Sequence, residues 1–167
     1  MNFAPGFYVP SFLEWFESIE LYVGVAYLDH GGRWTLGMGH SNLRPPIVKE
    51  GDTISLEDAR QLLKDDLEYI WRRLEPHLPS TLSDWQKNVC TSLAFNGGVS
   101  GFLRSDVAAM INNTEKKYNL WYATDLIKEY KVTAKDKHTG IRRRFVGLSG
   151  NRRTDEAFFF QKDIPTT

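Results

Sequence analysis

The sequence predicts an α+β fold in which a long helix joins a small β-containing lobe to a larger helical lobe. Three observations support this prediction. Short β-prone segments flank a glycine-rich turn between residues 23 and 38. An apolar stripe at helical spacing then runs without a break from Ala59 to Leu74. From residue 78 onward, helical patterns are separated by serines, asparagines and glycines typical of helix ends.

The length of 167 residues suits one domain, so we expect a single domain with two lobes. The β-containing lobe should span about 21–54 and the connecting helix about 55–77, which leaves 1–20 and 78–167 for the helical lobe. A hydrophobic content of 41% is ample for a core. The net charge is zero, so the whole molecule has no bias towards nucleic acid or membrane. The sequence gives no sign of oligomers, and a monomer is the default expectation.

The first helix should begin at Ser11, because Ser11 and Glu14 have the spacing of a capping box. Apolar residues continue this helix to about Glu20, where a β-prone segment with a glycine follows. Two short strands are then expected at 25–28 and 34–38, on either side of a tight turn.

Serines mark the starts of the later helices. Ser55 precedes the long apolar stripe, which ends at Pro76 after about five turns. Ser83 opens a helix that should end near Asn96, and Ser105 opens a short one. Further helices are expected from about residue 118 and from about 151, with an exposed polar loop at 131–140 between them.

The chemistry-bearing residues lie in the first forty positions. Glu20 ends the first helix, Asp29 opens the turn, and Thr35 lies in the second strand. Glycosidic bond cleavage needs one carboxyl group to protonate the leaving oxygen and a second on the other face. A helix C-terminus carries partial negative charge, which suits a carboxyl group that must hold a proton. The plainer interpretation is a helix-end glutamate and a turn aspartate, each of which is common. Glu17 is a rival acid one helical turn earlier, but only Glu20 has the spacing to Asp29 described next.

The spacing of Glu20, Asp29 and Thr35, followed by Leu36-Gly37-x-Gly39-His40, resembles phage-type lysozymes, the endolysins of glycoside hydrolase family 24. Weaker matches follow in the expected order at 58–66, 94–98 and 147–156. A glycine that often follows the family's glutamate is Leu21 here. The resemblance implies a lysozyme-like fold with its active cleft between the two lobes.

The same resemblance implies hydrolysis of the β-1,4 bond between N-acetylmuramic acid and N-acetylglucosamine in bacterial peptidoglycan, without metal or cofactor. Glu20 would be the acid, while Asp29 and Thr35 would hold a water in an inverting reaction. A lytic transglycosylase and a catalytically silent wall-binding module are the alternatives. Since transglycosylation places no water, the presence of Asp29 and Thr35 argues against the first. The intact set of three residues argues against the second.

Three more residues are candidates for the site. Asn96 is expected either to cap its helix or to bind an N-acetyl sugar, and His40 either to bind substrate or to support its loop. The resemblance implies that Arg152 forms an ion pair with Glu20. Otherwise, Arg152 and Arg153 would be surface charges, with Arg153 pairing Glu156.

Charge is unevenly distributed along the chain. Residues 128–153 carry nine basic and two acidic side chains, a net charge of +7. This segment is either a solvated face or a contact for anionic wall or membrane polymers. No nucleic-acid-binding motif and no histidine or cysteine metal pattern is present, although His30 and His40 lie near Asp29.

The single cysteine, Cys90, excludes an internal disulfide and should be a buried thiol. The first residues have neither the basic region nor the apolar run of a signal peptide. We therefore expect synthesis in the cytoplasm without a signal peptide. The resemblance implies that this is the cytoplasm of a bacterial host and that the protein acts on the cell wall after release. The resemblance implies that a holin provides this release.

Overall fold

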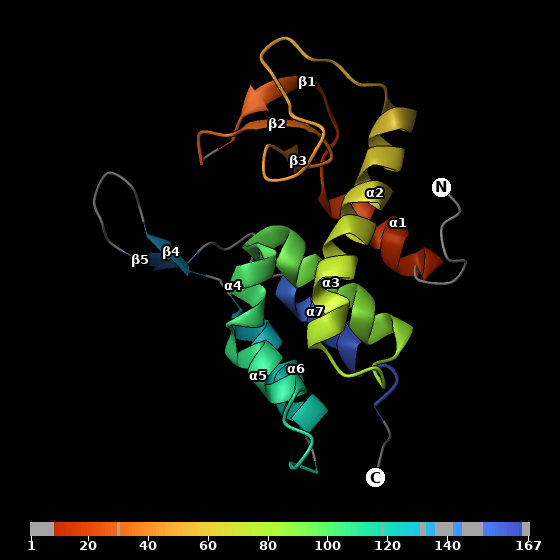
Figure 1. Cartoon of the computed structure of the whole chain (residues 1–167), viewed down its shortest axis with the longest axis vertical. Coiled ribbons are helices and arrows are strands. Elements are labelled where there is room, and N and C mark those ends of the chain that lie inside the picture. The colour runs from red at the N-terminus through yellow and green to blue at the C-terminus, as the bar shows by residue number, and fades with distance from the viewer. Residues whose placement is uncertain are drawn as a thin grey trace. The chain divides into compact units, whose positions relative to one another are not determined.

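The structure, a computed structural model, describes residues 9–29, 31–117, 119–130, 133–135, 142–144 and 152–164 (Figure 1). The chain divides into two compact units. We call Pro10–Tyr69 the N-terminal unit and Ile70–Thr167 together with Met1–Val9 the C-terminal unit. The prediction that the chain forms a single domain stays a prediction.

The N-terminal unit opens with helix α1 (Pro10–Ile19). This helix begins at Pro10, so Ser11 lies in the first turn and is not the cap expected from the sequence. Proline suits this position because its fixed φ is already helical and its missing N–H would have no partner there. The backbone N–H of Glu20 donates to the Phe16 carbonyl at 3.1 Å, which places Glu20 at the helix end as predicted.

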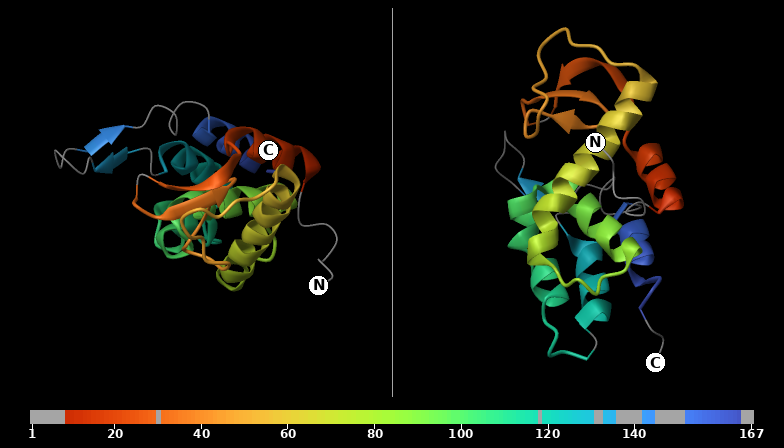
Figure 2. Two further views of the ribbon diagram at one scale, coloured as in Figure 1. Left: turned by 90° about the horizontal axis from the view of Figure 1, so that it is seen from above. Right: turned by 45° about the vertical axis from the view of Figure 1, so that its right-hand side comes forward.

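A three-stranded antiparallel sheet follows, in the order β1 (Val23–Leu28), β2 (Trp34–Gly37) and β3 (His40–Ser41) (Figure 2). The first two strands confirm the predicted hairpin. The short strand β3 was not predicted, because two residues carry no readable alternation. Gly37 and Gly39, with φ of +66° and +84°, form the connection between β2 and β3, where a side chain would strain the backbone.

Helix α2 (Leu56–Leu74) is the long helix of the chain, and it begins in the N-terminal unit. Ser55 caps it, since the Ser55 hydroxyl accepts the Asp58 N–H at 3.1 Å. The apolar stripe predicted for this helix is buried: Ala59, Leu63, Leu67, Ile70, Trp71 and Leu74. An added Cβ on Gly37 would lie 3.2 Å from the Ala59 Cβ, so β2 packs closely against α2.

The C-terminal unit consists mainly of helices. Its elements are η1 (Glu75–His77), α3 (Asp84–Gly97), α4 (Val99–Leu103), α5 (Asp106–Ile111), α6 (Asn119–Glu129), β4 (Thr133–Lys135), β5 (Arg142–Arg144) and α7 (Arg153–Gln161). Ser83 and Gln86 form a capping box at α3, and Ser105 caps α5, as predicted. Helix α4 was not predicted, and β4 falls inside the segment expected to be a loop, where it pairs with β5.

Helix α3 supplies the centre of this unit's core. Val89, Cys90 and Leu93 are fully buried, which confirms the expected burial of the cysteine. Burial raises the pKa of the Cys90 thiol far above its ordinary value. Trp85 of α3 stacks on Phe159 of α7 with ring centroids 5.1 Å apart. Within the described ranges, no helix has both the length and the apolar character needed to cross a membrane.

Candidate active site

Glu20 lies directly after α1 and is partly exposed. The rival Glu17 lies within the helix, where its carboxylate accepts a hydrogen bond from the Arg60 Nε of α2 at 3.1 Å. Glu17 therefore already has a structural partner on the neighbouring helix. The assignment of Glu20 as the acid stays a prediction. The position of Glu17 does not favour Glu17 as the acid in its place.

Asp29 closes the β1–β2 hairpin. Its backbone N–H donates to the Arg33 carbonyl, and its carbonyl accepts the Gly32 N–H, both at 2.9 Å. One carboxylate oxygen, Oδ1, also accepts the Arg33 N–H at 2.9 Å. This bond is what an aspartate at a turn ordinarily makes, so it fixes the carboxyl group without proving a catalytic role.

Thr35 lies in the middle strand of the sheet, with its side chain 3% exposed. It pairs with Tyr27 across β1 and with Ser41 across β3. Its hydroxyl donates to the Arg33 carbonyl at 3.2 Å, which orients the oxygen lone pairs. Asp29 and Thr35 are thus both tied to Arg33, on the two sides of the turn.

Tyr27 is related to each of the three predicted residues, by charge to Glu20 and Asp29 and by strand pairing to Thr35. Burial raises the pKa of its phenol, and the negative charges of Asp29 and Glu20 raise it further. Both carboxylates therefore act on one side chain, which lies opposite Thr35 in the sheet. The sequence reasoning did not single out Tyr27. Its position two residues before Asp29, on the same face of a strand, was the available signal.

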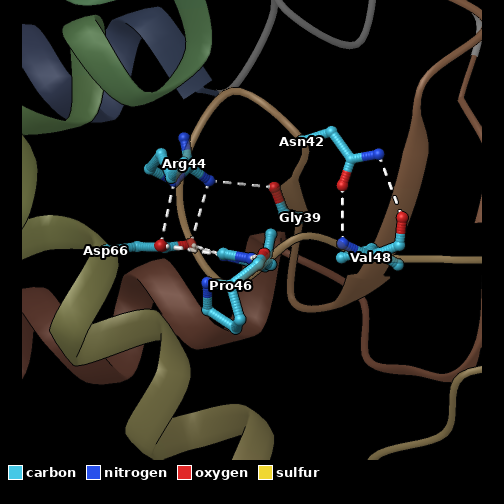
Figure 3. Close-up of polar contacts among 7 residues, drawn as sticks. Gly39, Asn42, Arg44, Pro46, Val48 and Asp66 are labelled. Atoms are coloured by element: carbon cyan, nitrogen blue, oxygen red, sulfur yellow. Dashed lines mark hydrogen bonds and ion pairs between the residues drawn. The ribbon is translucent and has the colours of Figure 1, made fainter.

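The loop after the sheet is held by a buried ionic network (Figure 3). His40 is 1% exposed, and its Nδ1 lies 2.9 Å from both carboxylate oxygens of Asp66 on α2. Its Nε2 lies 2.8 Å from the Pro46 carbonyl oxygen. The Arg44 Nη2 donates to Asp66 at 2.9 Å and to the Gly39 carbonyl at 3.2 Å.

This network contains the contacts that the loop-supporting interpretation of His40 expects. Both ring nitrogens lie within hydrogen-bond distance of oxygen atoms of the protein, so the ring is held from two sides. The Asn42 side chain adds two bonds to the Val48 backbone, at 2.6 and 3.0 Å. His40 therefore supports its loop, as the plainer interpretation held. A direct contact between His40 and substrate stays a prediction.

A second buried network lies in the C-terminal unit, around the carboxylate of Glu156. Arg153 forms an ion pair with Glu156, and Arg152 donates to it from Nε at 3.2 Å. Ser92 donates to the same carboxylate at 2.5 Å. Arg153 also donates to the Asn96 Oδ1 at 2.7 Å. One carboxylate on α7 thus gathers partners from α3 and from its own helix.

These contacts settle part of the sequence predictions. The pairing of Arg153 with Glu156 is confirmed, but the expectation of surface charges is wrong, because Arg152 and Arg153 are both buried. Asn96 is not the helix cap, since α3 continues to Gly97 and Gly98 forms the cap with φ of +78°. The predicted pair between Arg152 and Glu20 joins residues of different units and stays a prediction.

Two other predictions concern a metal site and the basic segment. Where the structure describes the chain, no three histidine, cysteine, aspartate or glutamate side chains gather as a metal site would require. His30 lies outside the described residues, as do most side chains of the basic segment 128–153. The interpretation of that segment as a contact for anionic polymers stays a prediction.

The small antiparallel sheet, the long helix and the helical unit define the class as an α+β protein with a lysozyme-like fold. A muramidase domain of SpmX from Asticaccaulis excentricus matches with a TM-score of 0.76 and 26% identity, over 91% of this chain and 95% of that one. An endolysin from Escherichia coli O157:H7 phage FAHEc1 matches in fold with a TM-score of 0.76 and 21% identity, over 95% and 96% of the two chains.

The sequence comparisons identify the family. Residues 16–146 match the phage lysozyme family model. An endolysin of Acyrthosiphon pisum secondary endosymbiont phage 1 is 30% identical over 144 residues, which cover 84% of this chain and 91% of the endolysin. An endolysin of Salmonella phage P22 is 32% identical over 120 residues, covering 71% and 80%. The chain belongs to the phage lysozyme family and is a glycoside hydrolase of the lysozyme type.

Proposed function

We propose that this protein is an endolysin with muramidase activity, which hydrolyses the β-1,4 bond between N-acetylmuramic acid and N-acetylglucosamine in bacterial peptidoglycan. The substrate is supported by the relatives named as endolysins and by the structural similarity to a muramidase domain. The observation within this molecule that carries the proposal is the sheet register, which pairs Tyr27 with Thr35 and places Asp29 two residues after Tyr27. The carboxylates of Asp29 and Glu20 both raise the pKa of the Tyr27 phenol.

In the proposed reaction, Glu20 protonates the glycosidic oxygen as general acid. Asp29 and the Thr35 hydroxyl hold a water on the other face of the sugar, and Asp29 draws a proton from it during attack. This arrangement gives inversion at the anomeric carbon. It predicts that the carboxyl groups of Glu20 and Asp29 are about 6.5–9.5 Å apart in the substrate complex, whereas about 5–5.5 Å would imply retention.

Asn96 is the proposed contact for an N-acetyl group. A guanidinium only donates hydrogen bonds, so the carbonyl oxygen of the Asn96 amide must face Arg153. The amide NH₂ is then directed away from Arg153, and Asn96 is exposed. An amide donor held in this orientation suits the carbonyl oxygen of an N-acetyl sugar. His40 would act on substrate through the shape of its loop, and Arg152 as a partner of Glu20.

The names of the same relatives support a proposal for the biological setting. We propose that the protein is made in the cytoplasm of a phage-infected bacterium, reaches the wall through a holin, and acts there as a monomer. The basic segment 128–153 would add attraction to anionic wall or membrane polymers. Binding to purified walls should then weaken as salt is raised, and replacement of the arginines at 142–144 should remove this dependence.

Mass spectrometry of the products released from purified peptidoglycan tests the function. Muropeptides with a free reducing end are expected, and proton NMR of early products should show the inverted anomer. Products with a 1,6-anhydro end would make the protein a lytic transglycosylase. Binding to peptidoglycan without any product would make it a silent wall-binding module. Either result would overturn the proposal.

A further inference from the structure

The phenol of Tyr27 has a position that the proposed reaction does not use. The side chain is 39% exposed, and within the described residues its hydroxyl makes no hydrogen bond with the protein. Tyrosine hydroxyls in folded proteins usually find a partner when they are buried. The Tyr27 phenol is partly exposed, so its hydroxyl can bond to a ligand from solution.

The sheet register brings Tyr27 to the residues of the reaction. Tyr27 lies directly opposite Thr35 in the antiparallel ladder, and directly opposite residues point to the same face of a sheet. Asp29 follows two positions later, and residues two apart along an extended chain point to the same side. Tyr27 thus lies on the strand that leads to Asp29 and pairs across the ladder with Thr35, the two residues proposed to hold the water.

The charges around Tyr27 determine how its hydroxyl can act. Partial burial and the nearby carboxylates of Asp29 and Glu20 all raise the pKa of the Tyr27 phenol, which favours its O–H form. Asp29 in its ionised form only accepts hydrogen bonds, and the Thr35 hydroxyl already donates to Arg33. Tyr27 therefore adds a donor to a group of residues that otherwise consists mainly of acceptors.

We propose that Tyr27 is a substrate-binding residue whose hydroxyl donates a hydrogen bond to an oxygen of the sugar held beside Glu20 and Asp29. The inference rests on the proposed function, because it takes the glycan strand as the ligand. A sugar ring carries hydroxyl and N-acetyl oxygens that accept such a bond. The contact would exist before and during the reaction, so it should act mainly on substrate affinity.

Tyr22 provides a matched control for this proposal. It is a tyrosine of the same unit with nearly the same exposure, 40%, but its hydroxyl donates to the Ile54 carbonyl at 2.7 Å. Replacement by phenylalanine removes only the hydroxyl in each case. Tyr27→Phe should remove a bond to substrate, whereas Tyr22→Phe should remove a bond within the protein.

The experiment compares wild type, Tyr27→Phe and Tyr22→Phe in steady-state hydrolysis of purified peptidoglycan strands and in urea unfolding. Tyr27→Phe is expected to raise KM by about two- to tenfold, the effect of one lost neutral hydrogen bond, with a smaller change in kcat. Its unfolding midpoint should match wild type. Tyr22→Phe should leave KM and kcat unchanged and lower the unfolding midpoint.

An unchanged KM in Tyr27→Phe, in a wild type that hydrolyses peptidoglycan, would overturn this inference alone. A lower unfolding midpoint in Tyr27→Phe with unchanged kinetics would also overturn it, because it would make the hydroxyl structural. Failure of the wild type to hydrolyse peptidoglycan would instead count against the proposed function. The binding of the same strands to the Tyr27→Phe protein would then be compared with wild type, and equal dissociation constants would overturn the inference.

Discussion

Two groups of polar residues in the N-terminal unit differ in how their hydrogen bonds are completed. In the loop network, the carboxylate of Asp66 is buried and bonded on both oxygens to His40 and Arg44. In the hairpin, Asp29 is partly exposed, and the one hydrogen bond described for its carboxylate is from the Arg33 N–H to Oδ1. The sequence contains both aspartates, but only their surroundings in the fold indicate that their roles differ.

This difference in hydrogen bonding indicates different roles for the two carboxylates. A buried carboxylate with all its acceptor positions used stabilises the fold, because removal of one partner leaves an uncompensated charge or donor. A partly exposed carboxylate at the end of a strand keeps acceptor capacity for water or substrate. Asp66 is therefore expected to matter for stability and Asp29 for turnover, although they are the same residue type in one unit.

The largest expected effect is on activity. Asp29→Asn keeps the bond to Arg33 through the amide oxygen but removes the charge that would activate water. General-base groups of this kind typically contribute about 10²–10⁴-fold, and a loss of this size in kcat is expected. Asp52→Asn is the matched control, since the Asp52 carboxylate also accepts a turn N–H, from Lys49 at 2.7 Å. Equal activity in the two variants would show that Asp29 acts only as a turn residue and would contradict its catalytic role.

The next effect is on stability. Asp66→Asn leaves the buried Arg44 without its counter-charge and is expected to lower the free energy of unfolding by about 3–5 kcal/mol. Urea denaturation measures it. The adjacent Asp65 is exposed and accepts a bond from Gln61 at 2.9 Å, so Asp65→Asn should change stability little. If Asp66→Asn were as stable as wild type, the proposed division between the two groups would fail.

A smaller expected effect concerns the ionisation of Tyr130. Burial raises the pKa of Tyr130 to about 12, against the smaller lowering effect of Arg153. The raised pKa means that the folded state holds the proton more tightly than the unfolded state. Its contribution to stability is therefore complete below about pH 10 and is lost as pH rises towards 12. Absorbance at 295 nm should show one tyrosine ionising last, and Tyr130→Phe should remove that step without affecting hydrolysis. Ionisation of all tyrosines together below pH 11 would contradict this prediction.

Much of the fold was predictable from local patterns. The hairpin around Asp29, the capping of helices by Ser55, Ser83 and Ser105, and the buried stripe of α2 all follow from spacing within a few residues. Strand β3 and helix α4 were missed because they are two and five residues long and depend on their neighbours.

The buried networks were not predictable from spacing alone. Asp66 lies on a helix among charged residues, and nothing nearby in the chain indicates that it meets His40 and Arg44 more than twenty positions earlier. Arg153 looked like a surface charge, but Tyr130, Asn96 and Glu156 together bond its guanidinium in the interior. In both cases, the side chain is satisfied by partners that only the tertiary fold supplies.

The central claim is that Glu20 is the acid of this lysozyme, and a comparison of Glu20→Gln with Glu17→Gln tests it most directly. The measurement is the rate at which reducing ends appear in purified peptidoglycan, with circular dichroism as the check on folding. Glu20→Gln should be folded and lose about 10²–10⁴-fold or more of the rate. Glu17→Gln, which loses only its pair with Arg60, should keep wild-type turnover. Appreciable activity in Glu20→Gln, or loss of activity only in Glu17→Gln, would contradict the assignment.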